Sequence, residues 1–253
     1  MSSQMNSFGA GDGASPRVWF LQALSEGMHA VVQPLAIAQA NLELVLFKGK
    51  TLEDYKQAAE DSLSHMFRGM ELLTYVHELI RANRVPDNLT PVPVAASLEA
   101  ALEDLRQILA EKQLQVSVQI DDPAMTVYGT AERLRQVFFY VLQAAQLQAN
   151  AGDTVTVRVP RLPEHEMSEA FIAITAPVSA TTAPLAGSEI DAQDAESTKE
   201  ATQAIQAQVM RSLTLAEAIV MCQQGEIECV MAPFGVRLRF SVAQGDNASR
   251  IMS

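Results

Sequence analysis

Apolar residues between positions 18 and 45 recur at alternating intervals of three and four residues. A period of 3.5 residues held over three heptads is typical of a helix in a bundle or coiled coil. The pattern predicts a long helix that begins after Pro16 and ends before Gly49. Its seam consists of Leu21, Leu24, Met28, Val31, Leu35, Ala38, Leu42 and Val45.

A second long helix is predicted directly after the first. Thr51 and Asp54 have the spacing of a capping box, which marks a helix start, and the pattern ends near Arg84, before Pro86. The second seam consists of Leu52, Tyr55, Ala59, Met66, Leu73, Val76 and Ile80. Two antiparallel helices of this size, each about 45 Å long, form a hairpin.

Further apolar residues flank both seams, more than one hairpin can bury. They are Val32, Leu44 and Leu46 on the first helix, and Leu63, Phe67 and Met70 on the second. A second hairpin would cover them, so we expect a homodimeric four-helix bundle.

The pattern changes to alternating helices and strands after a proline-rich linker. Helices are predicted over 97–113, with Ser97 as N-cap, and over 131–149 and 213–224. Strands are predicted over 114–120, 153–159 and 169–176, and a closing β-hairpin over 226–232 and 236–242. Residues 176–208 have few large apolar side chains, which predicts a mobile loop with a weak helix.

The whole pattern predicts an α+β fold with two domains. We expect a disordered tail over 1–17, the helical hairpin over 18–85, a linker over 86–96, an α/β domain over 97–243 and a second tail over 244–253.

Composition narrows the class of protein. The 253 residues are 48% hydrophobic, and 30 acidic residues against 18 basic ones give a net charge of −12. A charge of this sign disfavours nucleic acid and anionic membranes as partners. With no run of 18 apolar residues and no signal-peptide pattern at the start, we expect a cytoplasmic protein without membrane contact.

The two cysteines, Cys222 and Cys229, fit no common metal motif. They indicate a reducing compartment and are best interpreted as buried small side chains. His65 and His77 are twelve residues apart on the second helix, too far to share a metal, and with His165 they are interpreted as isolated histidines.

The segment "GMHAVVQPL", residues 27–35, carries the candidate chemistry. His29 follows the seam residue Met28 and so lies about 100° further round the helix, beside the seam, where it can reach solvent. A neutral imidazole can accept and carry a phosphoryl group. Pro34 has no N–H and leaves the carbonyl of Ala30 without its donor, which should bend the helix beside His29.

In this order of elements the chain resembles a bacterial sensor histidine kinase core over residues 18–243. The family's phosphoacceptor motif is His, an acidic residue, two variable residues, a polar residue and Pro-Leu; here it is His29-Ala30-Val31-Val32-Gln33-Pro34-Leu35. "EKQLQVSVQIDDPAMTVYGTAERLRQVFFYVLQAA" and "GDTVTVRV" are similar to the family's ATP-binding domain. The resemblance implies that His29 is the phosphoacceptor and that Gln33 positions a water or contacts a partner.

The nucleotide boxes depart from the family's pattern. The N-box asparagines are replaced by Tyr140 and Ala144, the Asp-x-Gly-x-Gly box by a strand that runs into Ala176, and the last glycines by Ser212 and Thr214. The chain would then lack the Mg²⁺ ligand, the adenine acceptor and the glycines that cradle phosphate. We therefore expect no ATP-dependent autophosphorylation, no cofactor and no metal.

Three hypotheses follow. The first is a two-component signalling protein that resembles kinase-like histidine phosphotransferases and acts as a phosphotransfer or docking module for a response-regulator receiver domain. The second is a regulatory pseudokinase that binds a partner kinase or receiver without accepting phosphate. The third is that the altered pocket holds another small ligand.

Overall fold

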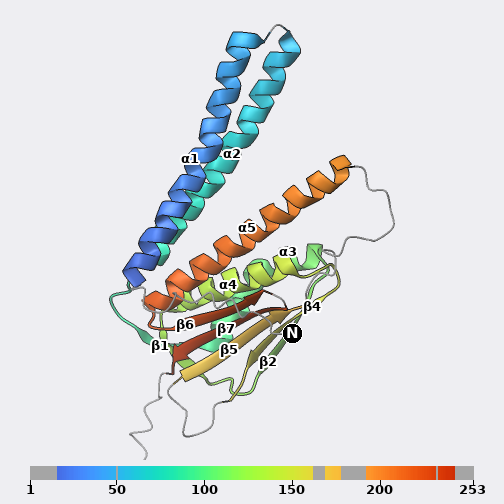
Figure 1. Cartoon of the computed structure of the whole chain (residues 1–253). Coiled ribbons are helices and arrows are strands. Elements are labelled where there is room, and N and C mark those ends of the chain that lie inside the picture. The colour runs from blue at the N-terminus through green and yellow to red at the C-terminus, as the bar shows by residue number, and fades with distance from the viewer. Residues whose placement is uncertain (1–15, 50, 162–168, 178–191, 232, 243–253) are drawn as a thin grey trace, which may run out of the picture. The chain divides into compact units, whose positions relative to one another are not determined.

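The computed structural model describes residues 16–49, 51–161, 169–177, 192–231 and 233–242. Within these residues the chain forms two compact units that divide between Arg84 and Val85 (Figure 1). The first unit is a helical hairpin and the second a mixed α/β unit, which confirms the predicted α+β fold. The predicted tails lie outside the described residues, except that Pro16 and Arg17 open the first helix.

The hairpin consists of α1 (Pro16–Lys48) and α2 (Leu52–Ala82). The capping box at the start of α2 is confirmed, because the Asp54 N–H donates to Thr51 Oγ1 at 3.1 Å and the Thr51 N–H donates to Asp54 Oδ2 at 2.9 Å. Helix α1 continues through Pro34.

Small residues form much of the contact between α1 and α2. A Cβ atom on Gly27 would lie 3.0 Å from Val76 Cγ2, and one on Gly69 would lie 3.1 Å from Leu35 Cδ2. The buried Ser62 hydroxyl donates to the Ala38 carbonyl at 3.1 Å. The two backbones can approach closely because these side chains take so little space.

The predicted seam of α2 is only partly buried. Val76 lies in the interior, whereas Met66 and Leu73 are exposed. The side of α2 that faces α1 carries the small residues Ser62 and Gly69. Large apolar residues are displaced to a neighbouring face.

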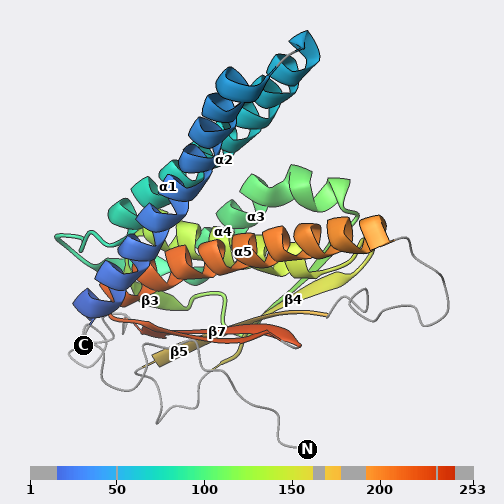
Figure 2. The same cartoon turned by 45° about the horizontal axis from the view of Figure 1, so that its top comes forward.

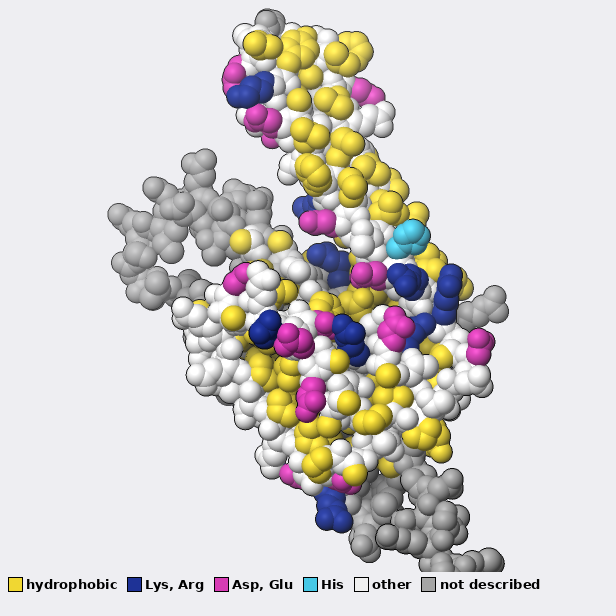
Figure 3. Space-filling model, turned by 180° about the vertical axis from the view of Figure 1, so that it is seen from behind, with side chains coloured by type: hydrophobic (Ala, Val, Ile, Leu, Met, Phe, Trp, Pro, Cys, Tyr) yellow, Lys and Arg dark blue, Asp and Glu magenta, His cyan; other side chains and the backbone are white. Residues whose placement is uncertain are grey.

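We call this exposed set the apolar face of the hairpin. It consists of Leu21, Met28, Val32, Leu35, Leu42 and Leu46 on α1, and Leu63, Met66, Phe67, Met70, Leu73 and Ile80 on α2. Figure 3 shows hydrophobic side chains gathered along the hairpin. By length and composition alone, Val18–Lys48 could also cross a membrane, with mean hydropathy 1.5 and 17% of that window buried. Absence of membrane contact thus stays a prediction.

The second unit contains a five-stranded sheet of order β2-β4-β5-β7-β6 and a two-stranded sheet of β1 and β3. Strands β2 and β4 are parallel and the other pairs antiparallel. Its strands are β1 (Thr90–Pro93), β2 (Gln115–Ile120), β3 (Thr126–Gly129), β4 (Thr154–Val159), β5 (Glu169–Ala176), β6 (Glu226–Met231) and β7 (Phe234–Ser241). Its helices are α3 (Val94–Glu111), α4 (Ala131–Gln148) and α5 (Ala192–Cys222).

The three helices cover one face of the large sheet (Figure 2). Strand β7 alternates as a one-sided sheet requires, with Phe234, Val236, Leu238 and Phe240 buried and Arg237 exposed. The predicted strands and the closing β-hairpin of β6 and β7 are confirmed, whereas the short β3 was not predicted.

The predicted linker contains structure. Residues 90–93 form β1, which pairs with β3, and α3 begins at Val94 directly after it. Ser97 is therefore not the N-cap; it lies inside the first turns, and its hydroxyl donates to the Pro93 carbonyl at 3.1 Å. The pairing with β3, which the local pattern did not reveal, sets the start of the helix.

Helix α5 is much longer than the predicted segment 213–224. It begins at Ala192, so the weak helix expected within 176–208 is the first part of this long helix, while residues 178–191 lie outside the described residues. Residues 192–208 are rich in alanine and glutamine, which favour helix. They extend a helix whose second half is anchored in the core.

Candidate functional site

His29 is exposed on α1 and points away from α2. Gly27, Val31 and Ala38 mark the side of α1 that packs against α2. His29 is two residues beyond Gly27, which at 100° per residue places it about 200° round the helix. Its side chain is open to solvent.

His29 belongs to an exposed row of polar side chains, which we call the polar row of α1. The row follows intervals of four, three and four residues and extends about 17 Å along the helix. It consists of Gln22, Glu26, His29 and Gln33, all exposed. Gln33 is thus brought onto the same face as His29, one turn away. The spacing of these residues was visible in the sequence but was overlooked beside the apolar seam.

The two ends of the polar row differ. At the N-terminal end the Gln22 amide donates to Glu26 Oε1 at 3.0 Å. Beyond Gln33, the next positions on the same line are the exposed Ala36 and Ala40. Their small side chains leave the surface beyond Gln33 open to a partner.

The turn that carries His29 is backed by close helix packing. The position of a Cβ on Gly27 lies 3.4 Å from Tyr75 Cε1, and that on Gly69 lies 3.7 Å from Pro34 Cγ. Pro34 is buried on this side. These contacts before and after His29 hold the histidine on a supported stretch of helix.

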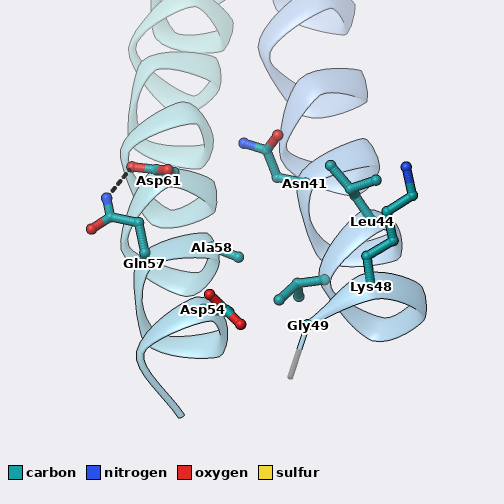
Figure 4. A pocket seen from close by; sticks show the side chains of 9 residues that line it. Asn41, Leu44, Lys48, Gly49, Asp54, Gln57, Ala58 and Asp61 are labelled. Atoms are coloured by element: carbon teal, nitrogen blue, oxygen red, sulfur yellow. Dashed lines mark hydrogen bonds between the residues drawn. The ribbon is translucent and has the colours of Figure 1, made fainter. Parts of the chain in front are cut away.

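A separate pocket lies near the turn of the hairpin (Figure 4). Asn41 and Lys48 of α1 and Asp54, Gln57 and Asp61 of α2 contribute to its lining. The Gln57 amide donates to Asp61 Oδ1 at 2.9 Å. Asn41 is twelve residues from His29, about 18 Å along the helix, so this pocket is separate from the turn that carries His29.

The altered N-box positions lie on α4. Ala144 is fully buried and has no polar side-chain atom. Tyr140 is half-buried, with its ring edge-on to that of Phe139 at 5.5 Å between centroids and 78° between planes. Neither residue offers the amide oxygen that would suit Mg²⁺.

The altered glycine positions lie within α5. The buried Ser212 hydroxyl donates to Gln143 Oε1 of α4 at 2.9 Å, and the Thr214 hydroxyl donates to the Met210 carbonyl at 2.9 Å. Residues 212–215 are continuous helix, so their backbone N–H groups point along the helix rather than into a phosphate-binding turn. The bridge between Ser212 and Gln143 was not predicted.

The altered adenine box lies at the end of β5. Ala176 is buried and pairs with Phe234, and Thr175 pairs with Gly235. Neither Thr175 nor Ala176 supplies a carboxylate, and residues 178–180 lie outside the described residues.

Burial strongly shifts the pKa values of a carboxyl and a thiol in the α/β unit. Burial raises the pKa of Glu217 to about 7. Burial, together with the nearby Glu217 charge, raises the pKa of Cys229 to about 12. The Cys229 thiol is therefore protonated at neutral pH, and its buried place on β6 agrees with the expected role of a small apolar side chain.

His65 and His77 both lie on α2, twelve residues apart. His65 is half-buried, His77 is exposed, and His165 lies outside the described residues. Across the described ranges, no group of three or more His, Cys, Asp or Glu side chains could hold a metal ion.

No family model matches the chain, and no curated protein matches it in sequence. Among solved structures it is similar to the Acinetobacter baumannii histidine kinase AdeS, at 14% identity over 85% of this chain and 98% of that chain, with a TM-score of 0.52. A histidine kinase from Burkholderia phymatum matches at 11% identity over 87% and 99% of the two chains, with a TM-score of 0.47. The chain has the fold of a sensor histidine kinase core, a helical hairpin followed by an ATPase-type α/β domain.

Proposed function

We propose that this protein acts in bacterial two-component signalling as a cytoplasmic histidine phosphotransfer or docking module for a response-regulator receiver domain. The observation that carries the proposal is His29, exposed within the polar row on a hairpin with the histidine kinase fold. A glutamine side chain such as Gln33 both donates and accepts hydrogen bonds, so the row suits a protein partner.

The chemistry needs no ATP. A neutral imidazole nitrogen attacks the phosphorus of an aspartyl-phosphate on the receiver; an N–P bond forms, the P–O bond to the aspartate breaks, and the ring proton leaves to solvent. Because the acyl phosphate is already activated, this transfer does not require the acidic residue that Ala30 replaces.

We also propose that the α/β unit does not bind ATP. Ala144 lacks a metal-binding oxygen, Ala176 lacks a carboxylate, and Ser212 is bonded to Gln143 between two packed helices. Thermal unfolding with and without MgATP tests this, because a ligand of the folded state raises the melting temperature. We expect no shift at millimolar nucleotide, and a saturable increase would contradict the proposal.

The apolar face of the hairpin supports a homodimer. Its large side chains extend along both helices, and a second copy would bury them as a four-helix bundle. The polar row argues against a membrane span, because Glu26, His29 and Gln33 would face lipid on the same helix.

The decisive test is transfer of labelled phosphate from phosphorylated receiver domains to the full chain. We expect wild type to gain an acid-labile, alkali-stable label and His29→Ala to gain none. The variant Gln107→Ala, which changes an exposed amide on α3, is the control and should retain transfer. Equal labelling of wild type and His29→Ala would exclude His29 as the acceptor.

A second candidate is a regulatory pseudokinase that binds a partner kinase or receiver without taking phosphate. Ala30 favours this candidate, because alanine stands directly after His29 where the family's phosphoacceptor motif has an acidic residue. Its signature would be an unlabelled wild-type chain whose receiver binding survives His29→Ala.

A further inference from the structure

Strand β2 forms one edge of the five-stranded sheet (Figure 1). Among the described residues it pairs only with β4, so no strand lies on its other side. Edge strands of soluble proteins commonly carry charged side chains or prolines, which prevent pairing with another chain. The opposite edge follows this rule, because β6 carries Glu226 and Glu228. The six residues of β2 include no charged side chain and no proline, so this edge is unprotected.

The backbone of β2 offers outward hydrogen bonds at every second residue. Gln115 pairs with Thr154 of β4, and its N–H donates to the Asp153 carbonyl at 3.0 Å. Because the direction of these groups alternates along a strand, the odd-numbered residues of β2 bond to β4 and the even-numbered ones face outward. Val116 and Val118 therefore present their N–H and C=O groups to any strand that is added beside β2.

Apolar side chains of β2 are incompletely covered at this edge. Val118 is 43% exposed, and Val116 and Ile120 are half-buried. In the parallel register Val116 and Val118 lie beside Val155 and Val157 of β4, which are both buried. The apolar row of the sheet thus continues to the edge and ends there in contact with water. A further strand beside β2 would bury more of this surface.

The sequence of β2 reads the same in both directions from Gln115 to Gln119, as Gln-Val-Ser-Val-Gln. A two-fold axis beside Ser117 would pair two antiparallel copies so that every residue meets a residue of its own type. In this register Val116 of one copy lies opposite Val118 of the other. Both residues direct their backbone groups outward, so each such pair exchanges two N–H to C=O hydrogen bonds. A shift by one residue would oppose outward-facing to inward-facing groups and lose these bonds.

We propose that the β2 edge is an interface between two copies of this chain, which join as antiparallel strands around Ser117. Charge supports a second copy as the occupant: the chain has a net charge of −12, but two β2 edges meet without opposing like charges. The valines of both copies would form one apolar cluster on the helix-covered face of the sheet. The amides of Gln115 and Gln119, which both donate and accept hydrogen bonds, would pair on the open face.

This interface uses different residues from the apolar face of the hairpin, and it does not depend on phosphotransfer at His29. A single pair of short strands buries little surface compared with a stable dimer interface. We therefore expect weak, reversible association, which covalent trapping can detect.

The first test is cysteine cross-linking of the full chain under mild oxidation. Opposed residues of a non-hydrogen-bonded antiparallel pair have Cα atoms about 4.5 Å apart, which a disulfide can span. Ser117→Cys should therefore form a disulfide-linked dimer. The matched control is Gln119→Cys, exposed on the same face, whose two copies would lie about 13 Å apart along the strands and should not link. The wild-type chain, with Cys222 and Cys229, gives the background.

The second test checks the register. Chains with Gln115→Cys and chains with Gln119→Cys should link when they are mixed, because the two positions lie opposite each other across the axis. Neither chain should link to itself. Ser117→Cys chains that stay unlinked, or single-cysteine variants that all link at the same rate, overturn the proposal; an unlinked edge would remain open to a strand of a different protein.

The third test places a charge at the axis. Adding Ser117→Lys to the mixed Gln115→Cys and Gln119→Cys chains opposes two like charges and should slow linkage about fivefold. The matched control Thr154→Lys adds the same charge at an exposed position of β4 beside Gln115 and should leave the rate nearly unchanged. Equal rates with both substitutions overturn the proposal. Circular dichroism of each variant confirms that it is folded, and because no phosphate is involved, failure here leaves the proposed function standing.

Discussion

At the scale of single residues, the glycines of the α/β unit differ in the space around them. A Cβ on Gly225, at the turn between α5 and β6, would lie 2.6 Å from the Arg239 carbonyl oxygen and 2.9 Å from Val220 Cγ1. A Cβ on Gly235 in β7 would meet only Thr175 Cγ2, at 3.7 Å. Backbone cannot move aside as a side chain can, so one methyl group has different consequences at the two sites.

We predict that Gly225→Ala lowers the free energy of unfolding by about 2–3 kcal/mol. The matched control Gly235→Ala should change it by less than about 0.5 kcal/mol. Urea denaturation followed by circular dichroism measures both values. Equal midpoints for the two variants would show that the turn relaxes around the methyl group.

Glu217 predicts a pH-dependent stability. Its folded pKa of about 7 lies above the ordinary value of 4.5, so between these values the unfolded chain binds fewer protons than the folded one. Stability therefore falls as pH rises through this window. Because Glu217 is partly exposed, the free energy of unfolding falls by only about 1–2 kcal/mol in total once the pH has risen above 7.

The variant Glu217→Gln should remove this loss. We expect it to be more stable than wild type by about 1–2 kcal/mol near pH 8, with the difference vanishing as pH falls toward 4.5. Urea titrations across this range measure the difference, and Glu99→Gln, an exposed change on α3, serves as control. A difference that is the same at every pH would contradict the assignment.

At the scale of elements, the hairpin shows why hydrophobic periodicity predicts two helices but does not predict which residues of one helix contact the other. The heptad pattern correctly predicted α1, and the Thr51 capping box correctly predicted the start of α2. The pattern did not reveal that Ser62 and Gly69 face α1, because a search for large apolar residues at heptad spacing passes over small and polar side chains. How closely two helix backbones approach depends on the side chains of both helices, so the pattern of one helix does not predict it.

The interhelical hydrogen bond of Ser62 gives a prediction at this scale. Ser62→Ala removes the buried donor to the Ala38 carbonyl and should cost about 1 kcal/mol. Ser64→Ala, an exposed serine two residues away on α2, should be close to neutral. Thermal or urea unfolding of the two variants provides the comparison, and a Ser62→Ala variant as stable as Ser64→Ala would argue that water replaces the bond.

At the scale of the whole molecule, the apolar face predicts self-association. Met70 is 63% exposed in a single chain, and burial against a second copy would remove it from water. Met70→Glu should raise the dimer dissociation constant at least about tenfold. Gln57→Glu, on another face of α2, should leave it unchanged, as sedimentation equilibrium can measure. A wild-type chain that sediments as a monomer would contradict the dimer.

The sequence by itself determined the helices of the hairpin, most strands of the sheet and the exposure of His29, because these depend on local periodicity. It also showed which side-chain atoms the nucleotide boxes lack. Only the tertiary structure decided that β1 pairs with β3 and that α5 begins at Ala192. It also placed Ser212 against Gln143 and revealed a pocket lined in part by His77 and Arg81. These features depend on contacts between segments that are far apart in the chain, or on polar side chains that share one side of a helix. Hydrophobic periodicity predicts neither of them.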